Sequence, residues 1–184
     1  LRCLVGSEMC IRDRELKAEG GVISGEQFVD ECQVESDLEL LLPATYVTGS
    51  SERMLLYREL DSLTLDKDVE AFRNRLIDRF GPVPSETEEL LRIVPLRRLA
   101  ARLGAEKVFL KGGRMSLFFI SNPESPYYQS QAFGKVIAYM MKYTRRCDLR
   151  EQNTRRSMLV KDVKNVETAV GVLQEIVAMQ VEEG

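Results

Sequence analysis

Apolar residues recur at intervals of three and four along residues 50–80, which is the spacing that gives a helix one buried face. The first predicted helix begins at Ser50 or Ser51, either of which can cap it, and runs to about Leu63. The second begins with a cap at Asp66 and carries a core-facing stripe on Val69, Phe72, Leu76 and Phe80. The pattern therefore predicts two consecutive amphipathic helices.

The segment LIDRFGPVP, residues 76–84, contains a complete set of signals for the end of a helix. Gly81 can adopt the left-handed backbone conformation that closes a helix. Pro82 and Pro84 prevent the helix from continuing, because proline has no backbone N–H to donate. We therefore expect the second helix to end before the glycine and a third helix to begin at once, at Ser85.

The third predicted helix opens with Ser85 and Glu88, whose spacing is that of a capping box. It is expected to end at Gly104. Pro95 falls inside this helix and removes the amide that would donate to a carbonyl one turn earlier. We therefore expect a kink near residues 91–94.

The hydrophobic period changes to two in the segments that flank these helices. Residues 34–42 alternate between an apolar face and an acidic face, which predicts a half-buried strand that ends at Pro43. Residues 107–111 and 114–121 form two more short strands, and Gly112-Gly113 between them is a strong hairpin signal. The residues expected to share the buried face of this hairpin are Val108, Leu110, Met115, Leu117 and Phe119.

Four further segments complete the predicted fold. Residues 129–143 have the pattern of a helix, and residues 147–152 and 156–160 that of a second hairpin with its turn at Asn153-Thr154. Asn165 caps a final helix. A helix after each hairpin favours a sheet that helices cover on one face. The predicted fold class is therefore α/β, of the α+β type: a small mixed β-sheet from two hairpins plus an N-terminal strand, packed by about five helices.

The N-terminal residues show no helical or strand period. Residues 9–13, MCIRD, resemble the translated end of a sequencing-library adapter, so we expect residues 1–13 to be an adapter-derived scar. Residues 14–33 are interpreted as the tail of an upstream helix followed by a glycine-rich linker. The folded domain is predicted to span residues 34–184.

The residue types present exclude several kinds of catalysis. The chain of 184 residues has no histidine, which removes histidine acid–base chemistry, Ser-His and Cys-His nucleophiles and mixed Cys/His zinc sites. Gly134-Lys135 lacks the remainder of a phosphate-binding loop. No C-x-x-C spacing occurs among the four cysteines, which are expected to be free thiols: Cys3, Cys10, Cys32 and Cys147. We therefore expect no catalytic, cofactor-binding or metal-binding residue in this chain.

The charge and hydropathy of the chain indicate which kinds of partner it lacks and where in the cell it is expected. A formal net charge of −3 gives no overall attraction to nucleic acid or to an anionic membrane. The apolar runs are far shorter than the ~20 residues that span a bilayer, so no membrane contact is expected. Free thiols fit a reducing compartment, and we expect a cytoplasmic protein.

Arginine pairs recur at Arg97-Arg98, Arg145-Arg146 and Arg155-Arg156. Arg98 and Arg102 are four residues apart and so share one face of the third predicted helix. Such a patch could hold phosphates through charge-assisted contacts, as in a nucleic-acid-binding accessory domain. It could also be a solvated face interleaved with acids, or a contact for an acidic protein surface.

Tyr127 and Tyr128 follow Pro126 in a loop rich in proline. Paired aromatic residues in this position could anchor a protein partner. They could also pack the loop onto the sheet. The sequence leaves both interpretations open.

Four segments carry a resemblance to a known family: LPATYVTGSSERMLLYRELDSL, LIDRFGPVP, LRRLAARLGAEKVFLKGG, and SNPESPYYQS with FGKVIAYM. In this order they resemble the C-terminal domain of the bacterial transcription-repair coupling factors (Mfd), over roughly residues 34–179. The SPYYQS and FGK segments are similar to the Bacteroidetes-type branch of that family. Pro95 departs from the family pattern, in which a helix former is usual at this position.

The resemblance implies a regulatory role. Members of this family are ATP-driven DNA translocases that displace stalled RNA polymerase and recruit the excision-repair protein UvrA. Their C-terminal domain is understood to contact the UvrA-recruiting module of the same chain and to mask its UvrA-binding surface. ATP and Mg would then belong to a motor outside this sequence, and RNA polymerase, UvrA and DNA would be partners of the parent protein. We expect the interdomain contact around Arg97, Arg98 and Arg102.

Overall fold

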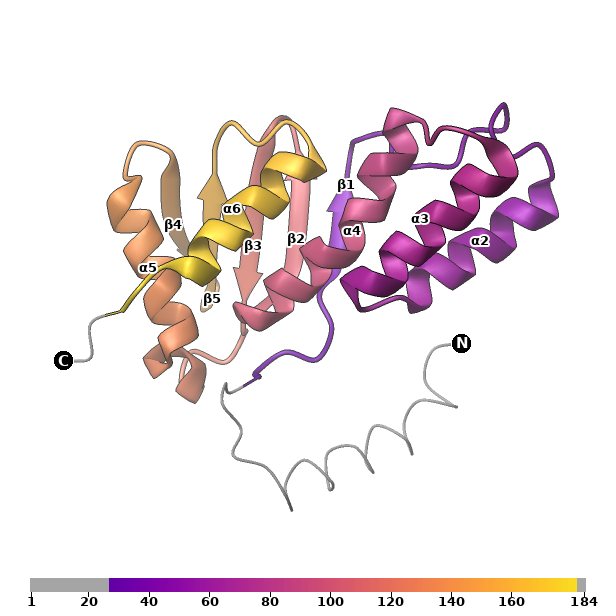
Figure 1. Ribbon diagram of the computed structural model, residues 1–184. Coiled ribbons are helices and arrows are strands. Elements are labelled where there is room, and N and C mark those ends of the chain that lie inside the picture. Colours follow the sequence, from indigo (N-terminus) through magenta and orange to yellow (C-terminus); the bar gives the residue numbers. More distant parts are fainter. Residues whose placement is uncertain (1–26, 182–184) are drawn as a thin grey trace, which may run out of the picture.

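A computed structural model describes residues 27–181 as a five-stranded sheet with five α-helices and one short 3₁₀ helix (Figure 1). The elements are β1 (Gln33–Ser36), α2 (Ser50–Ser62), α3 (Asp66–Phe80), α4 (Ser85–Arg102), β2 (Ala105–Lys111), β3 (Arg114–Phe119), η1 (Pro126–Gln129), α5 (Gln131–Lys142), β4 (Cys147–Gln152), β5 (Arg155–Val160) and α6 (Val166–Ala178). The strands lie in the order β1-β2-β3-β5-β4. β1 is parallel to β2, and the other pairs are antiparallel. The predicted α+β fold with a mixed sheet is confirmed.

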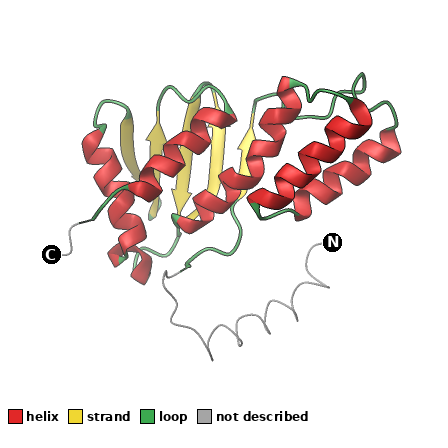
Figure 2. Ribbon diagram, in the orientation of Figure 1, coloured by secondary structure: helices red, strands yellow, loops and turns green. Residues whose placement is uncertain are grey.

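Helices α4, α5 and α6 lie on one face of the sheet, while α2 and α3 pack beside α4 at the β1 side (Figures 1 and 2). The predicted scar at residues 1–13 and most of the predicted linker at 14–33 fall outside the described residues. Within the described part of that linker, Val29 and Cys32 are buried against the sheet.

The first hairpin, β2–β3, forms as predicted. Gly112 and Gly113 both have positive φ, 61° and 70°, which is the two-residue turn that matches the twist of paired strands. Val108 pairs with Leu117 and Leu110 with Met115. All four side chains are buried beneath the helices, together with Phe119. The alternation read from the sequence therefore gives the core face of the central strands correctly.

The second hairpin, β4–β5, also forms, and its turn is at Asn153 and Thr154 with φ of 52° and 65°. β5 begins at Arg155, one residue earlier than predicted. Asparagine tolerates the left-handed conformation better than most residues, whereas threonine rarely adopts it. The polar turn was therefore a weaker signal than the glycine pair of the first hairpin.

The predicted strand at residues 34–42 is wrong in its length, because β1 covers only Gln33–Ser36. β1 ends because its partner strand, β2, ends. The Asp37 amide donates the last hydrogen bond of this pair to the Leu110 carbonyl at 3.1 Å, and β2 turns at Gly112 soon after. The Leu38 amide then donates to the Ser36 hydroxyl at 3.0 Å, which bends the chain away. Alternation alone could not show where the neighbouring strand ends.

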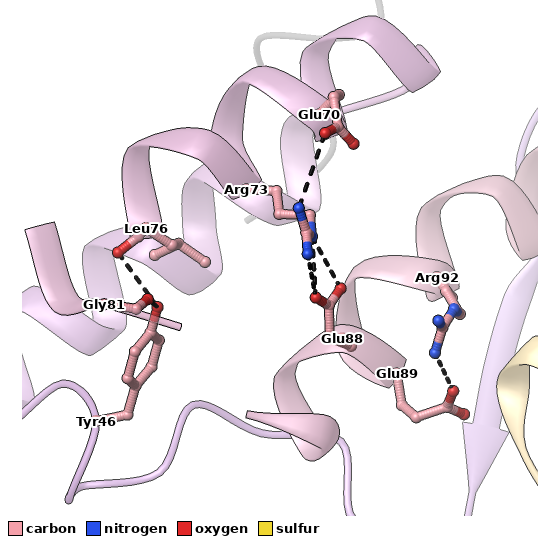
Figure 3. Close-up of polar contacts among 8 residues, drawn as sticks. All are labelled: Tyr46, Glu70, Arg73, Leu76, Gly81, Glu88, Glu89 and Arg92. Atoms are coloured by element: carbon pink, nitrogen blue, oxygen red, sulfur yellow. Dashed lines mark hydrogen bonds and ion pairs between the residues drawn. The ribbon is translucent and has the colours of Figure 1, made fainter. Parts of the chain in front are cut away.

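The predicted side-chain caps of the first three helices are also wrong. Gly49, Leu65 and Pro84 occupy the cap positions, and none makes a side-chain capping bond. The Ser85–Glu88 capping box does not form, because the Glu88 carboxylate instead accepts three hydrogen bonds from Arg73 on α3 (Figure 3). The predicted cap of the final helix, α6, is confirmed, because the Asn165 side chain accepts a hydrogen bond from the Thr168 amide at 2.7 Å.

The segment 76–84 ends α3 as predicted, and Tyr46 supports its end. Gly81 has a φ of 87° and donates its amide to the Ile77 carbonyl at 2.9 Å. The Tyr46 hydroxyl lies 2.8 Å from the Gly81 carbonyl and 3.2 Å from the Leu76 carbonyl (Figure 3). Burial raises the pKa of Tyr46, so the hydroxyl keeps its proton and can donate.

Two hydrophobic clusters make up the interior. The smaller one, called here the helical core, lies among α2, α3 and the first half of α4 and consists of Leu42, Val47, Leu56, Leu60, Phe72, Leu76, Leu91 and Val94. The larger one, called the sheet core, lies between the sheet and α4, α5 and α6, and includes Leu96, Leu99 and Ala100 of α4. α4 runs uninterrupted through Pro95 and contributes to both. The predicted kink at residues 91–94 stays a prediction.

Tyr127 and Tyr128 pack the loop onto the sheet, which decides between the two interpretations of this pair. Tyr127 is fully buried and its hydroxyl donates to the Leu103 carbonyl. Tyr128 is half-buried and its hydroxyl donates to the Ile120 carbonyl. The Tyr127 ring lies directly over Gly104, so close that no side chain fits between them.

We predict that Gly104→Ala destabilises the protein by about 2–5 kcal/mol. A Cβ at this position would lie 2.1 Å from a Tyr127 ring carbon, and the residue already has a φ of 82°. Gly112→Ala is the matched control, because it has a φ of 61° but nothing within 4 Å. It should cost only the ~1–2 kcal/mol of the backbone conformation. Urea unfolding of both variants measures the difference, and equal losses would contradict the contact.

We also predict that Tyr46→Phe lowers the free energy of unfolding by about 1 kcal/mol, since it removes the hydrogen bond that supports the end of α3. Tyr46→Ala should cost about two to three times more, because it also removes the ring that packs edge-on against Phe80 at 5.6 Å. Thermal and urea unfolding test both variants. A Tyr46→Phe variant as stable as the parent would show that the hydroxyl contributes nothing.

Candidate functional site

The arginines predicted to make the interdomain contact lie along the second half of α4, and two of them already have partners. Arg97 donates to the Asp61 carboxylate at the end of α2, at 3.1 Å. Arg98 forms a bidentate contact with the Asp66 carboxylate at the start of α3, through two hydrogen bonds of 2.9 Å each. Arg102 is exposed and has no ion pair with any residue in the described range.

These ion pairs tie the α2–α3 connection to α4 at the surface. The Arg97 and Arg98 side chains are 23% and 39% exposed, and their aspartate partners are more exposed still. Ion pairs in such positions contribute roughly 0–1 kcal/mol and weaken as salt is added. Both arginines can therefore exchange their present partners for groups on another surface at little cost.

Arg97 also lines a cleft of about 620 Å³ between β1 and the helices α2 and α4. The apolar part of its lining is formed by Val34, Tyr57, Leu60, Leu90 and Ile93. Its lining also includes charged side chains from both sides of the cleft: Glu31, Glu35, Arg58, Asp61 and Arg97. Apolar side chains together with charged ones are the usual composition of a protein-binding surface.

Some charged residues of the cleft have an ion-pair partner and others do not. Lys107 lies 2.9 Å from Glu35 and lowers the pKa of its carboxyl by hydrogen bonding, and Lys111 lies 3.5 Å away. Glu31 and Arg58, in contrast, make no ion pair within the described part of the chain. The cleft thus presents one acid and one base that are available to a partner.

The two cysteines within residues 27–181 are buried thiols. Cys32 is a buried residue that borders the cleft, and burial raises the pKa of its thiol to about 12. Burial also raises the pKa of Cys147. Both are free, as predicted, and both stay protonated near neutral pH. Among residues 27–181, no group of three or more cysteines or acids is placed to hold a metal ion.

The outer surfaces of α2 and α3 are mostly covered by their own ion pairs. Arg75 pairs with Glu59 and Arg79 with Glu52, both across α2 and α3. Arg73 holds Glu88 of α4 from the other side of α3 (Figure 3). Two large apolar side chains remain exposed on α2 close to these pairs: Met54 at 57% and Leu55 at 64%.

The three arginine pairs do not meet in one patch. Arg146 donates to the Lys161 and Asp162 carbonyls beside β4, and Arg156 pairs with Glu151 and lies over the Tyr128 ring at 4.3 Å. The structure therefore separates them from the arginines of α4. Apart from Arg97, the cleft residues were not found from the sequence, because they come from three distant segments that carry no shared motif.

No helix within residues 27–181 is both long enough and apolar enough to cross a membrane.

Comparison with known proteins agrees with the fold and with the sequence motifs. A family model described as TRCF domain matches residues 36–130, just over half of the 184 residues. The transcription-repair-coupling factor of Rickettsia bellii is 30% identical over 132 residues, covering 71% of this chain. Those of Rickettsia typhi and Staphylococcus haemolyticus are each 25% identical, covering 79% and 68% of this chain.

These relatives are much longer than the chain, which spans only 11–12% of their length. A crystal structure of the C-terminal domain of a transcription-repair coupling factor has the same fold, with a TM-score of 0.62 at 18% identity. The alignment covers 80% of this chain and 93% of that domain. As its motifs predicted, the chain belongs to the TRCF-domain family of the transcription-repair coupling factors.

Proposed function

We propose that this chain is a regulatory domain without catalytic activity of its own, which contacts the UvrA-recruiting module of its parent protein. By covering that module, the domain masks the UvrA-binding surface until the parent engages RNA polymerase. The contact uses the cleft between β1, α2 and α4, with Arg97, Arg98 and Arg102 along one side.

The observation that carries this proposal is the cleft itself. Apolar side chains at its centre can exclude water from a contact, while the surrounding charges can fix the orientation of the partner. Arg58 and Glu31 have no ion pair of their own within the described residues. A partner that supplies an acid and a base at matching positions would therefore complete the electrostatics of this surface.

The weak ion pairs of α4 suit a contact that must open again. A masking domain has to be released by a competing state of the parent, so its affinity should be moderate and sensitive to charge. The partly exposed Arg97 and Arg98 can pair with the module in one state and with Asp61 and Asp66 in the other. The cost of exchange between these states is small because both sets of pairs are solvated.

We further propose that the remaining functions of this family belong to the parent protein. There the proposal assigns ATP, Mg and DNA to a translocase motor outside these residues, and RNA polymerase and UvrA as further partners. The two buried, protonated thiols of the described part support a binding role for this domain rather than a chemical one.

We predict that the 184-residue chain binds the purified UvrA-recruiting module of its own parent, as measured by isothermal titration calorimetry. Affinity should fall markedly between about 50 mM and 500 mM salt. Arg97→Glu and Arg58→Glu should each weaken binding about tenfold or more, because each places an acid on the rim of the cleft.

Arg145→Glu is the matched control, since Arg145 is exposed in the turn before β4, away from the cleft. It should bind like the unchanged chain. Arg58→Glu breaks no internal ion pair, which guards against a loss caused by misfolding. The absence of binding at low salt, or equal losses in all three variants, would contradict the proposal.

A further inference from the structure

One face of the sheet is not covered by any described helix. The core residues of β2 and β3, with Met158 and Val160 of β5, point toward α4, α5 and α6. Their alternate neighbours, including the buried Leu159, point the other way. In Figures 1 and 2 the described helices lie in front of the sheet or beside it. The uncovered face therefore presents a regular surface of side chains to solvent.

Two phenylalanines occupy the middle of this face. Phe109 of β2 and Phe118 of β3 are on adjacent strands, with ring centroids 5.3 Å apart in an edge-on arrangement. Both are only partly buried. Large aromatic residues on the open face of a sheet are unusual unless a partner uses them, because water disfavours exposed apolar rings.

A hollow of about 350 Å³ lies beside Phe118, between β3, β5 and β4. Its lining includes amides and hydroxyls that can both donate and accept hydrogen bonds, from Gln152, Asn153, Ser116 and Ser157. The charged side chains in its lining are Arg150 and Arg155, and no carboxylate contributes to it. The hollow therefore combines hydrogen-bonding groups and two arginines with the apolar side chains of Phe118 and Leu159.

Arg155 carries an unused donor at this position. Its guanidinium carbon lies 5.3 Å from the centroid of the Phe118 ring, and one terminal nitrogen pairs with Glu106 at 3.3 Å. Its Nε is buried and has no acceptor among the described residues. A buried N–H without an acceptor costs free energy, so it favours a ligand that brings an oxygen to this place.

The other charges of this face lie around the two phenylalanines. Lys107 and Lys111 are 4.8 Å and 5.0 Å from the centroid of the Phe109 ring. The carboxylates nearby each have a fixed contact: Glu35 with these lysines, Asp148 with Arg150, and Asp37 with the Gly112 amide. Both arginines of the hollow are therefore ion-paired, Arg150 with Asp148 and Arg155 with Glu106. Solvated pairs of this kind can be exchanged for phosphates at little cost.

We infer that this uncovered face binds single-stranded nucleic acid. Bases would stack on the ring of Phe118 and on the guanidinium of Arg155. One base would enter the hollow, where its polar edge would form hydrogen bonds with the amides and hydroxyls of the lining. Phosphates would contact Arg150 and Arg155. Unpaired bases are flat and stack well on aromatic rings that lie on a sheet, and the phosphates of the nucleic acid contact the cationic side chains beside those rings. An acidic peptide would satisfy the arginines, but it has no flat ring for the platform.

This inference does not rest on the proposed contact at the cleft, although Glu35 borders both the cleft and the uncovered face. The test is fluorescence anisotropy of the 184-residue chain with a labelled oligothymidylate of about 12 nucleotides. The chain should bind it more tightly than a duplex of equal length. The logarithm of affinity should fall linearly with the logarithm of salt concentration, by about 0.7 for each phosphate neutralised.

Phe118→Ala should weaken binding about 5- to 150-fold, which corresponds to the loss of one stacked base, while Phe118→Tyr should keep it. Arg155→Gln and Arg156→Gln form a matched pair, because adjacent residues of a strand point to opposite faces and Arg156 lies over Tyr128 under the helices. Only Arg155→Gln should weaken binding. Far-UV circular dichroism of each variant verifies that it is folded.

Four results would overturn the inference: no binding at low salt, equal losses from Arg155→Gln and Arg156→Gln, tighter binding to the duplex, or full competition by polyglutamate. Equal losses would indicate unspecific attraction to charge. Competition by polyglutamate would indicate an acidic protein as the partner of this face instead.

Discussion

Helix α4 is buried in both hydrophobic cores, and the remainder of the structure depends on this shared burial. Its first half gives Leu91 and Val94 to the helical core, and its second half gives Leu96 and Leu99 to the sheet core. Each such side chain contributes on the order of 1.5–3 kcal/mol when fully buried. Neither core could keep its position relative to the other without this helix. The changeover from one core to the other falls at Pro95, between Val94 and Leu96.

The candidate sites follow from this arrangement. Because α4 holds α2 and α3 to one side of β1, a cleft remains between that strand and the helices. Because α4, α5 and α6 all cover the same face of the sheet, the opposite face stays open with Phe109 and Phe118 partly exposed on it. The fold thus has two surfaces that we propose as binding sites, one lined by apolar side chains and charges of both signs and one with aromatic rings and ion-paired arginines.

Much of the fold could be predicted from the sequence because its signals are local. The stripe that ends at Phe80, the Gly112-Gly113 turn and the Asn165 cap each depend on a few neighbouring residues. The errors arose where a distant residue decides the outcome. Glu88 leaves its capping box because Arg73 of another helix lies within 2.7 Å, and β1 ends early because β2 turns at Gly112.

The candidate site was less predictable for the same reason. The sequence placed Arg98 and Arg102 on one face of a helix, but it gave no means of knowing that Asp61 and Asp66 would reach Arg97 and Arg98. The cleft joins residues of β1, α2 and α4, so it exists only after the chain has folded. The resemblance to coupling factors supplied a role for the domain, and the packing of α4 supplies the surface that would perform it.

The central claim, that α4 unites the two cores, is tested most directly by native-state hydrogen exchange in increasing urea. If α4 couples the cores, amides of α3 and amides of β3 should exchange through one common opening, with the same free energy and the same dependence on urea. The account would be contradicted if α2 and α3 amides became exchangeable at urea concentrations where β2 and β3 remain fully protected.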